Sequence, residues 1–176
     1  MLDELGVEGG SIVVREPLAA FLGALAPDET VAYTFADVVK LAGHACPTTA
    51  AAFVACRAGL AALYPGSTPV RGEVTVTVDG GSGDGSLGVT ALVFQLLTGA
   101  APATGFKGLG GKFRRKDLLT FDPAAAGPEG VSLRLARTDT GRAVRLRICP
   151  RSIPFAAKKA ARMGALMERA LWGAAG

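Results

Sequence analysis

The segment from Pro47 to Tyr64 constrains the fold strongly, because the helix that it predicts is apolar on nearly every side. Pro47 suits the first helical position, where its missing N–H leaves no hydrogen bond unmade. Pro65-Gly66 ends the segment. A helix that is apolar all round is buried inside a larger structure. Other parts of the chain must therefore cover this helix from several directions.

Strands that could form such a cover are visible as alternating sequence. The segment from Glu73 to Val78 alternates strictly between polar and apolar residues, which is typical of a strand with one buried face. Residues 131–135 and 144–148 alternate in the same way, and a turn over 139–141 between them predicts a β-hairpin. A further short strand is predicted over 117–121.

Helices are predicted from apolar residues at helical spacing. They cover residues 35–42 and 86–97, a segment that starts at Pro17, and a C-terminal segment over 154–173. Along the chain, the predicted elements are helices, a strand, a helix, further strands and a final helix. That order predicts a single α+β domain over residues 1–176, with helices packed on an antiparallel or mixed sheet.

Composition and length agree with one well-filled domain: the chain has 176 residues, of which 49% are hydrophobic and 19% are charged. The longest apolar stretch, residues 50–64, is broken by Arg57 and is shorter than the roughly 20 residues of a membrane-spanning helix. The acidic start of the chain does not resemble a secretory signal, so a cytoplasmic location is expected. Cys46, Cys56 and Cys149 form neither an even disulfide set nor a paired zinc motif.

The formal net charge of +4 is unevenly distributed, because basic residues cluster over 107–116 and over the predicted hairpin. No aromatic residue is interleaved with the hairpin arginines, so nucleic-acid binding is not expected. Arg134 opposite Arg145 or Arg147 would be repulsive unless a carboxylate or an anionic partner lies between them. A solvated face is the simpler interpretation of the hairpin, and a docking surface for a larger protein is the alternative.

His44, the only histidine of the chain, and Cys46 lie two residues apart at the predicted bend before Pro47. The N-terminus of a helix favours the thiolate form of a cysteine. A thiolate beside an imidazole suits zinc or another divalent metal. The same pair suits a thiol enzyme in which His44 accepts the proton of Cys46. Purely structural roles, with Cys46 capping the helix and His44 in the turn, stay open as well.

A His-x-Cys pair supplies two ligands, whereas zinc usually takes three or four from the protein. Asp84, in the glycine-dense loop over residues 79–85, is the best candidate for a third ligand, with helix capping as its alternative role. Residues 105–112 are rich in glycine and carry Lys107 and Lys112, without the spacing of a Walker loop. This loop is suited to hold a small anionic ligand, or it is simply a solvated basic loop.

The sequence Gly-His-Ala-Cys-Pro over residues 43–47 resembles the Gly-His-x-Cys-Pro-Gly signature of the FmdE family, which is named after a component of formylmethanofuran dehydrogenase. The similarity extends over roughly residues 16–122. In order, this region contains a valine-rich strand, a loop ending in Asp84, a helix closing with Leu97-Thr98-Gly99, and Gly111-Lys112 before a strand. Thr48 stands where the family usually has glycine, and the C-terminal zinc finger of some members is absent.

This resemblance implies an α+β core, a homodimer and a metal-associated pocket at His44 and Cys46, and it carries Lys112 over as the lysine of the family's Gly-Lys. Together with the chemistry of the pair, it predicts a zinc-binding protein with His44, Cys46 and Asp84 as ligands. Lys107 and Lys112 would then steer a small anionic ligand to the open coordination position. Two alternatives stay open: an accessory protein docking on a larger redox enzyme, and a metal-free enzyme with Cys46 and His44 as catalytic residues.

Overall fold

The computed structural model describes residues 10–127 and 130–149, together with residues 164, 168, 169 and 173. The C-terminal helix predicted over 154–173 therefore lies almost wholly outside the described residues, as do the first nine residues of the chain.

A mixed four-stranded sheet organises the described fold. Its strands are β3 (Val74–Asp79), β4 (Leu119–Asp122), β5 (Val131–Arg137) and β6 (Ala143–Ile148), in the spatial order β4-β3-β5-β6. Strand β4 runs parallel to β3, whereas β5 runs antiparallel to β3 and to β6. The predicted strand at 73–78 and the predicted hairpin are confirmed, and so is the α+β fold class.

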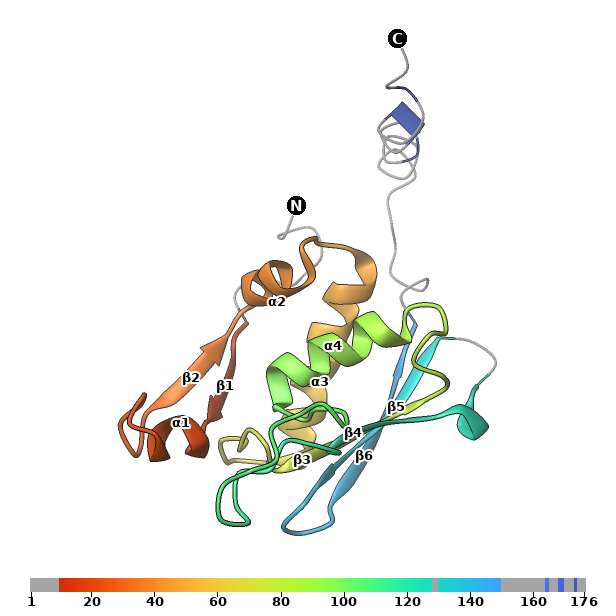
Figure 1. Ribbon diagram of the computed structural model, residues 1–176. Coiled ribbons are helices and arrows are strands. Elements are labelled where there is room, and N and C mark those ends of the chain that lie inside the picture. Colours follow the sequence, from red (N-terminus) through yellow and green to blue (C-terminus); the bar gives the residue numbers. More distant parts are fainter. Residues whose placement is uncertain (1–9, 128–129, 150–163, 165–167, 170–172, 174–176) are drawn as a thin grey trace.

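Helices α3 (Pro47–Leu63) and α4 (Leu87–Thr98) lie on one face of this sheet, and α2 (Phe35–Ala42) packs against both of these helices (Figure 1). The side chains of Val74, Val76 and Val78 in β3 point to that face and are fully buried there. Phe53 of α3 and Phe94 of α4 are fully buried in the same core. The three helices predicted for these segments are confirmed, with their ends shifted by at most one residue.

Helix α3 is less enclosed than its composition predicts. Val54, Ala58 and Ala61 form an exposed stripe along one side of it. Small side chains on this stripe expose little apolar surface, so an alanine-rich sequence does not distinguish a wholly buried helix from one with an open side. The opposite side of the helix nevertheless belongs to the core, because its own side chains Cys56, Leu60 and Leu63 are buried there.

The N-terminal part of the chain differs from the prediction. Strands β1 (Ile12–Arg15) and β2 (Thr30–Tyr33) form an antiparallel pair that sequence reasoning missed. The helix predicted from Pro17 exists but has five residues, α1 (Pro17–Phe21), and none of them is buried. Phe21 is 64% exposed, so the apolar side chains of this segment do not pack in the core as those of the other predicted helices do.

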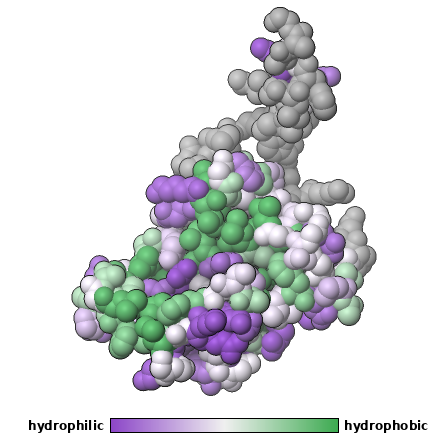
Figure 2. Space-filling view, viewed as in Figure 1, coloured by the Kyte–Doolittle hydropathy of each residue, from purple (hydrophilic) through white to green (hydrophobic). Residues whose placement is uncertain are grey.

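Apolar side chains reach the surface over α2 and α4 and again at the α1 end of the molecule (Figure 2). Leu41 at the end of α2 and Leu92 of α4 are 40% and 38% exposed, and Phe21 and Leu22 are more exposed still. Among the described residues, no helix is both long and apolar enough to span a membrane.

Candidate functional site

A sharp turn between α2 and α3 brings His44 and Cys46 together. Helix α2 begins with a capping box, in which the carboxylate of Asp37 accepts hydrogen bonds from the N–H and the hydroxyl of Thr34 at 2.9 and 2.8 Å. The helix ends at Gly43, whose φ of 73° lies in the left-handed region that favours glycine. The chain then reverses, and Cys46 becomes the N-cap residue of α3.

Cys46 occupies a position where hydrogen bonds favour its thiolate. Thr49 closes the first turn of α3: its hydroxyl accepts from the Cys46 N–H at 3.0 Å and lies 3.7 Å from the Cys46 sulfur. Partial burial acts to raise the pKa of the Cys46 thiol. The hydrogen bonds from Thr49, from His44 and from the Thr48 N–H outweigh that effect, so the thiol pKa falls below its ordinary value.

His44 is exposed beside this thiol. Its Nδ1 lies 2.9 Å from the carbonyl oxygen of Ala42. A hydrogen bond there needs a proton on Nδ1, which leaves Nε2 as the nitrogen able to bind a metal or to exchange a proton. The Ala42 carbonyl, followed by the neighbouring Cys46 sulfur, raises the pKa of the imidazole above its ordinary value. The two residues therefore favour each other's charged forms.

Asp84 has a local role. Its carboxylate accepts a hydrogen bond of 2.7 Å from the Gly81 N–H, while its own N–H donates to the Gly81 carbonyl at 3.0 Å, so the side chain closes the loop before α4. No group of three His, Cys, Asp or Glu side chains that could hold a metal ion occurs within the described residues. The structure thus brings His44 and Cys46 together and does not place the predicted third ligand with them.

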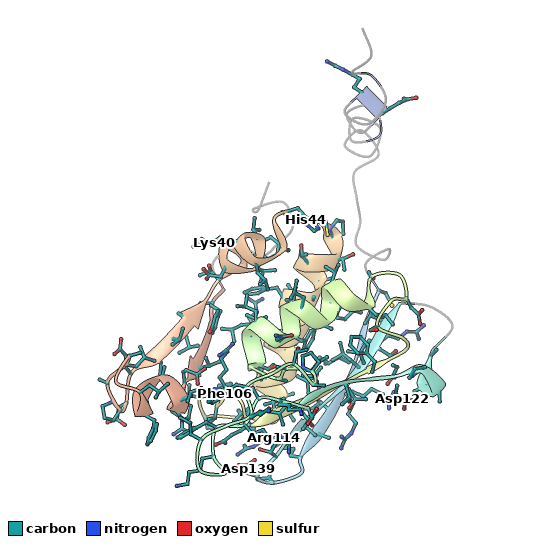
Figure 3. The ribbon with its side chains drawn as sticks, in the orientation of Figure 1. Lys40, His44, Phe106, Arg114, Asp122 and Asp139 are labelled. Atoms are coloured by element: carbon teal, nitrogen blue, oxygen red, sulfur yellow. The ribbon has the colours of Figure 1, made fainter. Side chains whose placement is uncertain are left out.

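The predicted anion-steering lysines lie elsewhere. Leu109 and Lys112 exchange two backbone hydrogen bonds of 2.9 Å and close a tight turn, which leaves Lys107 and Lys112 exposed. Figure 3 shows Phe106 and Arg114, which flank this turn, near the bottom of the molecule, with His44 at the top. Within one chain, the two lysines are therefore not beside the His44–Cys46 pair.

A buried ion cluster, which sequence reasoning missed, lies next to this loop. The carboxylate of Glu16 pairs with Arg71, at 2.6 Å, and with Arg115. Glu16 and Arg115 are 8% and 7% exposed. Burial lowers the pKa of the Arg115 guanidinium, an effect that the Glu16 carboxylate partly offsets. Glu16 and Arg115 are 99 residues apart, so no local spacing could have indicated this contact.

The hairpin of β5 and β6, which carries the clustered arginines, has a register that places two arginines opposite each other, as the sequence predicts. Arg134 of β5 lies directly opposite Arg145 of β6. Arg145 donates from Nη1 to the carboxylate of Asp79 at 2.5 Å, and that carboxylate is buried at the end of β3. A carboxylate of the chain itself thus relieves the repulsion between the two strands and neutralises one of the charges that a docking surface would use.

The fold and the site together define an α+β domain with a His–Cys pair at the N-terminus of its central helix. No protein-family model matches the chain, and no curated protein or solved structure matches it significantly.

Proposed function

We propose that this chain is a metal-binding protein that holds a divalent ion, zinc in the first instance, between the Cys46 sulfur and Nε2 of His44. The supporting observation is the lowered pKa of the Cys46 thiol at the N-terminus of α3, with the exposed imidazole of His44 beside it. Zinc binds thiolate rather than thiol, so a site that favours the thiolate is prepared for the metal. The family resemblance implies the same pair.

The donor set fits zinc in chemistry but does not complete its coordination. A thiolate and an imidazole are ligands that zinc prefers. Because Asp84 closes its own loop, the remaining positions are open to a small anionic ligand and to a group from outside the described chain segment. When bound, the metal would act as a Lewis acid on that ligand. The residues of this chain would hold the metal and keep one face of it accessible.

A homodimer would bring further groups to this site and is part of the proposal. Leu41 and Leu92 are exposed on neighbouring helices, and Leu41 lies three residues before His44. Burying such side chains against a second copy would remove apolar surface from water. Lys107 and Lys112 belong to the turn between Phe106 and Arg114, which Figure 3 shows at the end of the molecule opposite His44, so they would reach the ligand at His44 only from the second copy.

Bound zinc per chain tests the metal site. Protein purified without a histidine tag and reconstituted with zinc should retain the ion, and Cys46→Ser and His44→Ala should each lose most of it. Cys56→Ala is the matched control, because Cys56 is fully buried and its thiol pKa is raised by burial. Circular dichroism verifies folding. A wild-type chain that takes up no zinc, or an equal loss in Cys56→Ala, would refute the site.

A metal-free thiol enzyme is the second candidate. The raised pKa of His44 and the lowered pKa of Cys46 are shifts toward an imidazolium–thiolate pair, and the described residues supply no third metal ligand to it. In such an enzyme Cys46 would be the nucleophile and His44 the proton carrier. A chain that binds no zinc but reacts at Cys46 with an alkylating reagent near neutral pH would favour this candidate.

A further inference from the structure

A pocket with a cavity of about 290 Å³ lies between the start of α1, the segment before β3 and the basic loop, which comprises residues 105–116. Its wall consists of Pro17, residues 71–73 and residues 112–115. These three segments are far apart in the sequence, and the Glu16 carboxylate joins them by pairing with both Arg71 and Arg115. The pocket is therefore built on a buried ion cluster and not on a flexible surface loop alone.

Positive charge is in excess around this pocket. Arg71, Lys112, Arg114 and Arg115 all contribute to the wall, to which Glu73 adds one carboxylate. Two of the guanidinium groups share the single carboxylate of Glu16, and Arg114 pairs with Asp117 at 2.5 Å. Four cations thus face three carboxylates. The ammonium group of Lys112 has no ion-pair partner within the described part of the chain.

The guanidinium of Arg115 has unused hydrogen-bonding capacity. Its Nη1 is buried and has no hydrogen-bond partner among the described residues. A Cβ atom on Gly72 or on Gly99 would collide with this nitrogen, so both positions need glycine for the guanidinium to fit. Arg71 is fixed as well, because its Nε donates to the Leu96 carbonyl at 3.0 Å. The two arginines are held in place before any ligand arrives, which lowers the ordering cost of binding.

We infer that this pocket binds a phosphate group, as inorganic phosphate or as the phosphate of a small monoester. Guanidinium groups form forked, charge-assisted hydrogen bonds with phosphate oxygens, and an ammonium group adds a further donor. A phosphate group offers more acceptor oxygens than a single carboxylate, so it can contact more than one of these cationic side chains at once. Arg115 and Arg71 form the floor of the site, and Lys112 and Arg114 close it. The site is complete within one chain and does not depend on the proposed metal centre.

Calorimetric titration of the full chain with inorganic phosphate, in a low-salt buffer free of phosphate, tests this inference. We expect saturable binding of one phosphate per chain. Lys112→Gln and Arg114→Gln should each weaken that binding by about tenfold, because each removes one charge-assisted contact. Both side chains belong to an exposed turn, so neither substitution threatens the core. Titration with methyl phosphate, if it binds equally well, identifies a monoester site, and binding of inorganic phosphate alone identifies a site for the free ion.

Lys107→Gln is the matched control, because Lys107 belongs to the same basic loop but does not line the pocket. In zinc-free protein, where the proposed metal site holds no anion, Lys107→Gln should bind phosphate as the wild type does. An absence of saturable binding would overturn the inference. A loss in Lys107→Gln as large as in Lys112→Gln would overturn it too, since the general charge of the loop would then account for the binding. Zinc occupancy is measured in the same samples, so the two proposals fail separately.

Discussion

Removing the shared carboxylate by Glu16→Gln should destabilise this fold strongly. Glu16 is 8% exposed and pairs with Arg115, which is 7% exposed and already has one nitrogen without a partner among the described residues. In the variant, Arg115 keeps its charge in a buried site without a counter-ion. Breaking a buried pair on one side costs about 3–5 kcal/mol of unfolding free energy. For a domain of this size, each kcal/mol lowers the melting temperature by roughly 2–4 °C.

Urea unfolding followed by circular dichroism measures this loss, with the slope against urea concentration checked for constancy. Asp117→Asn is the matched control: it breaks the Arg114–Asp117 pair, which has the same kind of contact but is exposed, and should cost no more than about 1 kcal/mol. Adding Arg115→Met to Glu16→Gln should restore much of the stability, since the buried guanidinium is then gone and only Arg71, which is partly exposed, lacks its carboxylate partner. A loss of less than about 1 kcal/mol in Glu16→Gln, or a double variant no better than the single one, would refute the reasoning.

Three further outcomes are expected. The alkylation rate of Cys46, measured as a function of pH, should rise with a midpoint below the ordinary thiol pKa of about 8.5. His44→Ala should move that midpoint upward, because it removes a hydrogen bond to the thiolate. The pKa of Asp139 should be about 2, because Arg137 donates hydrogen bonds to its carboxylate; its NMR titration should shift upward in Arg137→Ala. Leu92→Lys should convert a dimer into a monomer in light scattering, and a variant that still dimerises would place the interface elsewhere.

The parts of the fold that could be predicted are those with a long local pattern. Alternation over 73–78 and the apolar run from Pro47 each extend over enough residues to identify the element. Strands β1 and β2 have four residues each, and β2 has no buried residue to reveal an alternation. The apolar spacing of helix α1 fits a core-facing helix, whereas its five residues lie on the surface. A sequence pattern shows amphipathicity but not whether another element covers the apolar side.

In the candidate site, too, local features could be predicted, whereas contacts between distant segments could not. His44 and Cys46 are two residues apart at a turn that glycine and proline define, so their proximity follows from local sequence. The pairing of Glu16 with Arg115 depends on how the N-terminal segment meets the basic loop, which no spacing encodes. Asp84 illustrates a third case. Its glycine-rich surroundings are as compatible with a metal ligand as with a carboxylate that binds the backbone of its own loop, and the structure shows the second role.

The two proposed centres lie at opposite ends of one chain, and this separation makes the proposed homodimer testable through the energetics of binding. Within a monomer, zinc at His44–Cys46 and phosphate at Lys112 share no side chain, so each should bind with an affinity independent of the other. In a dimer that places the basic loop of one copy against the metal site of the other, the lysines would serve both ligands. Zinc and phosphate would then alter each other's affinity by the same factor. Phosphate titrations of zinc-loaded and zinc-free protein decide the matter: equal affinities exclude a shared site, and a change that Lys107→Gln abolishes would assign that lysine to the metal-bound ligand of the second copy.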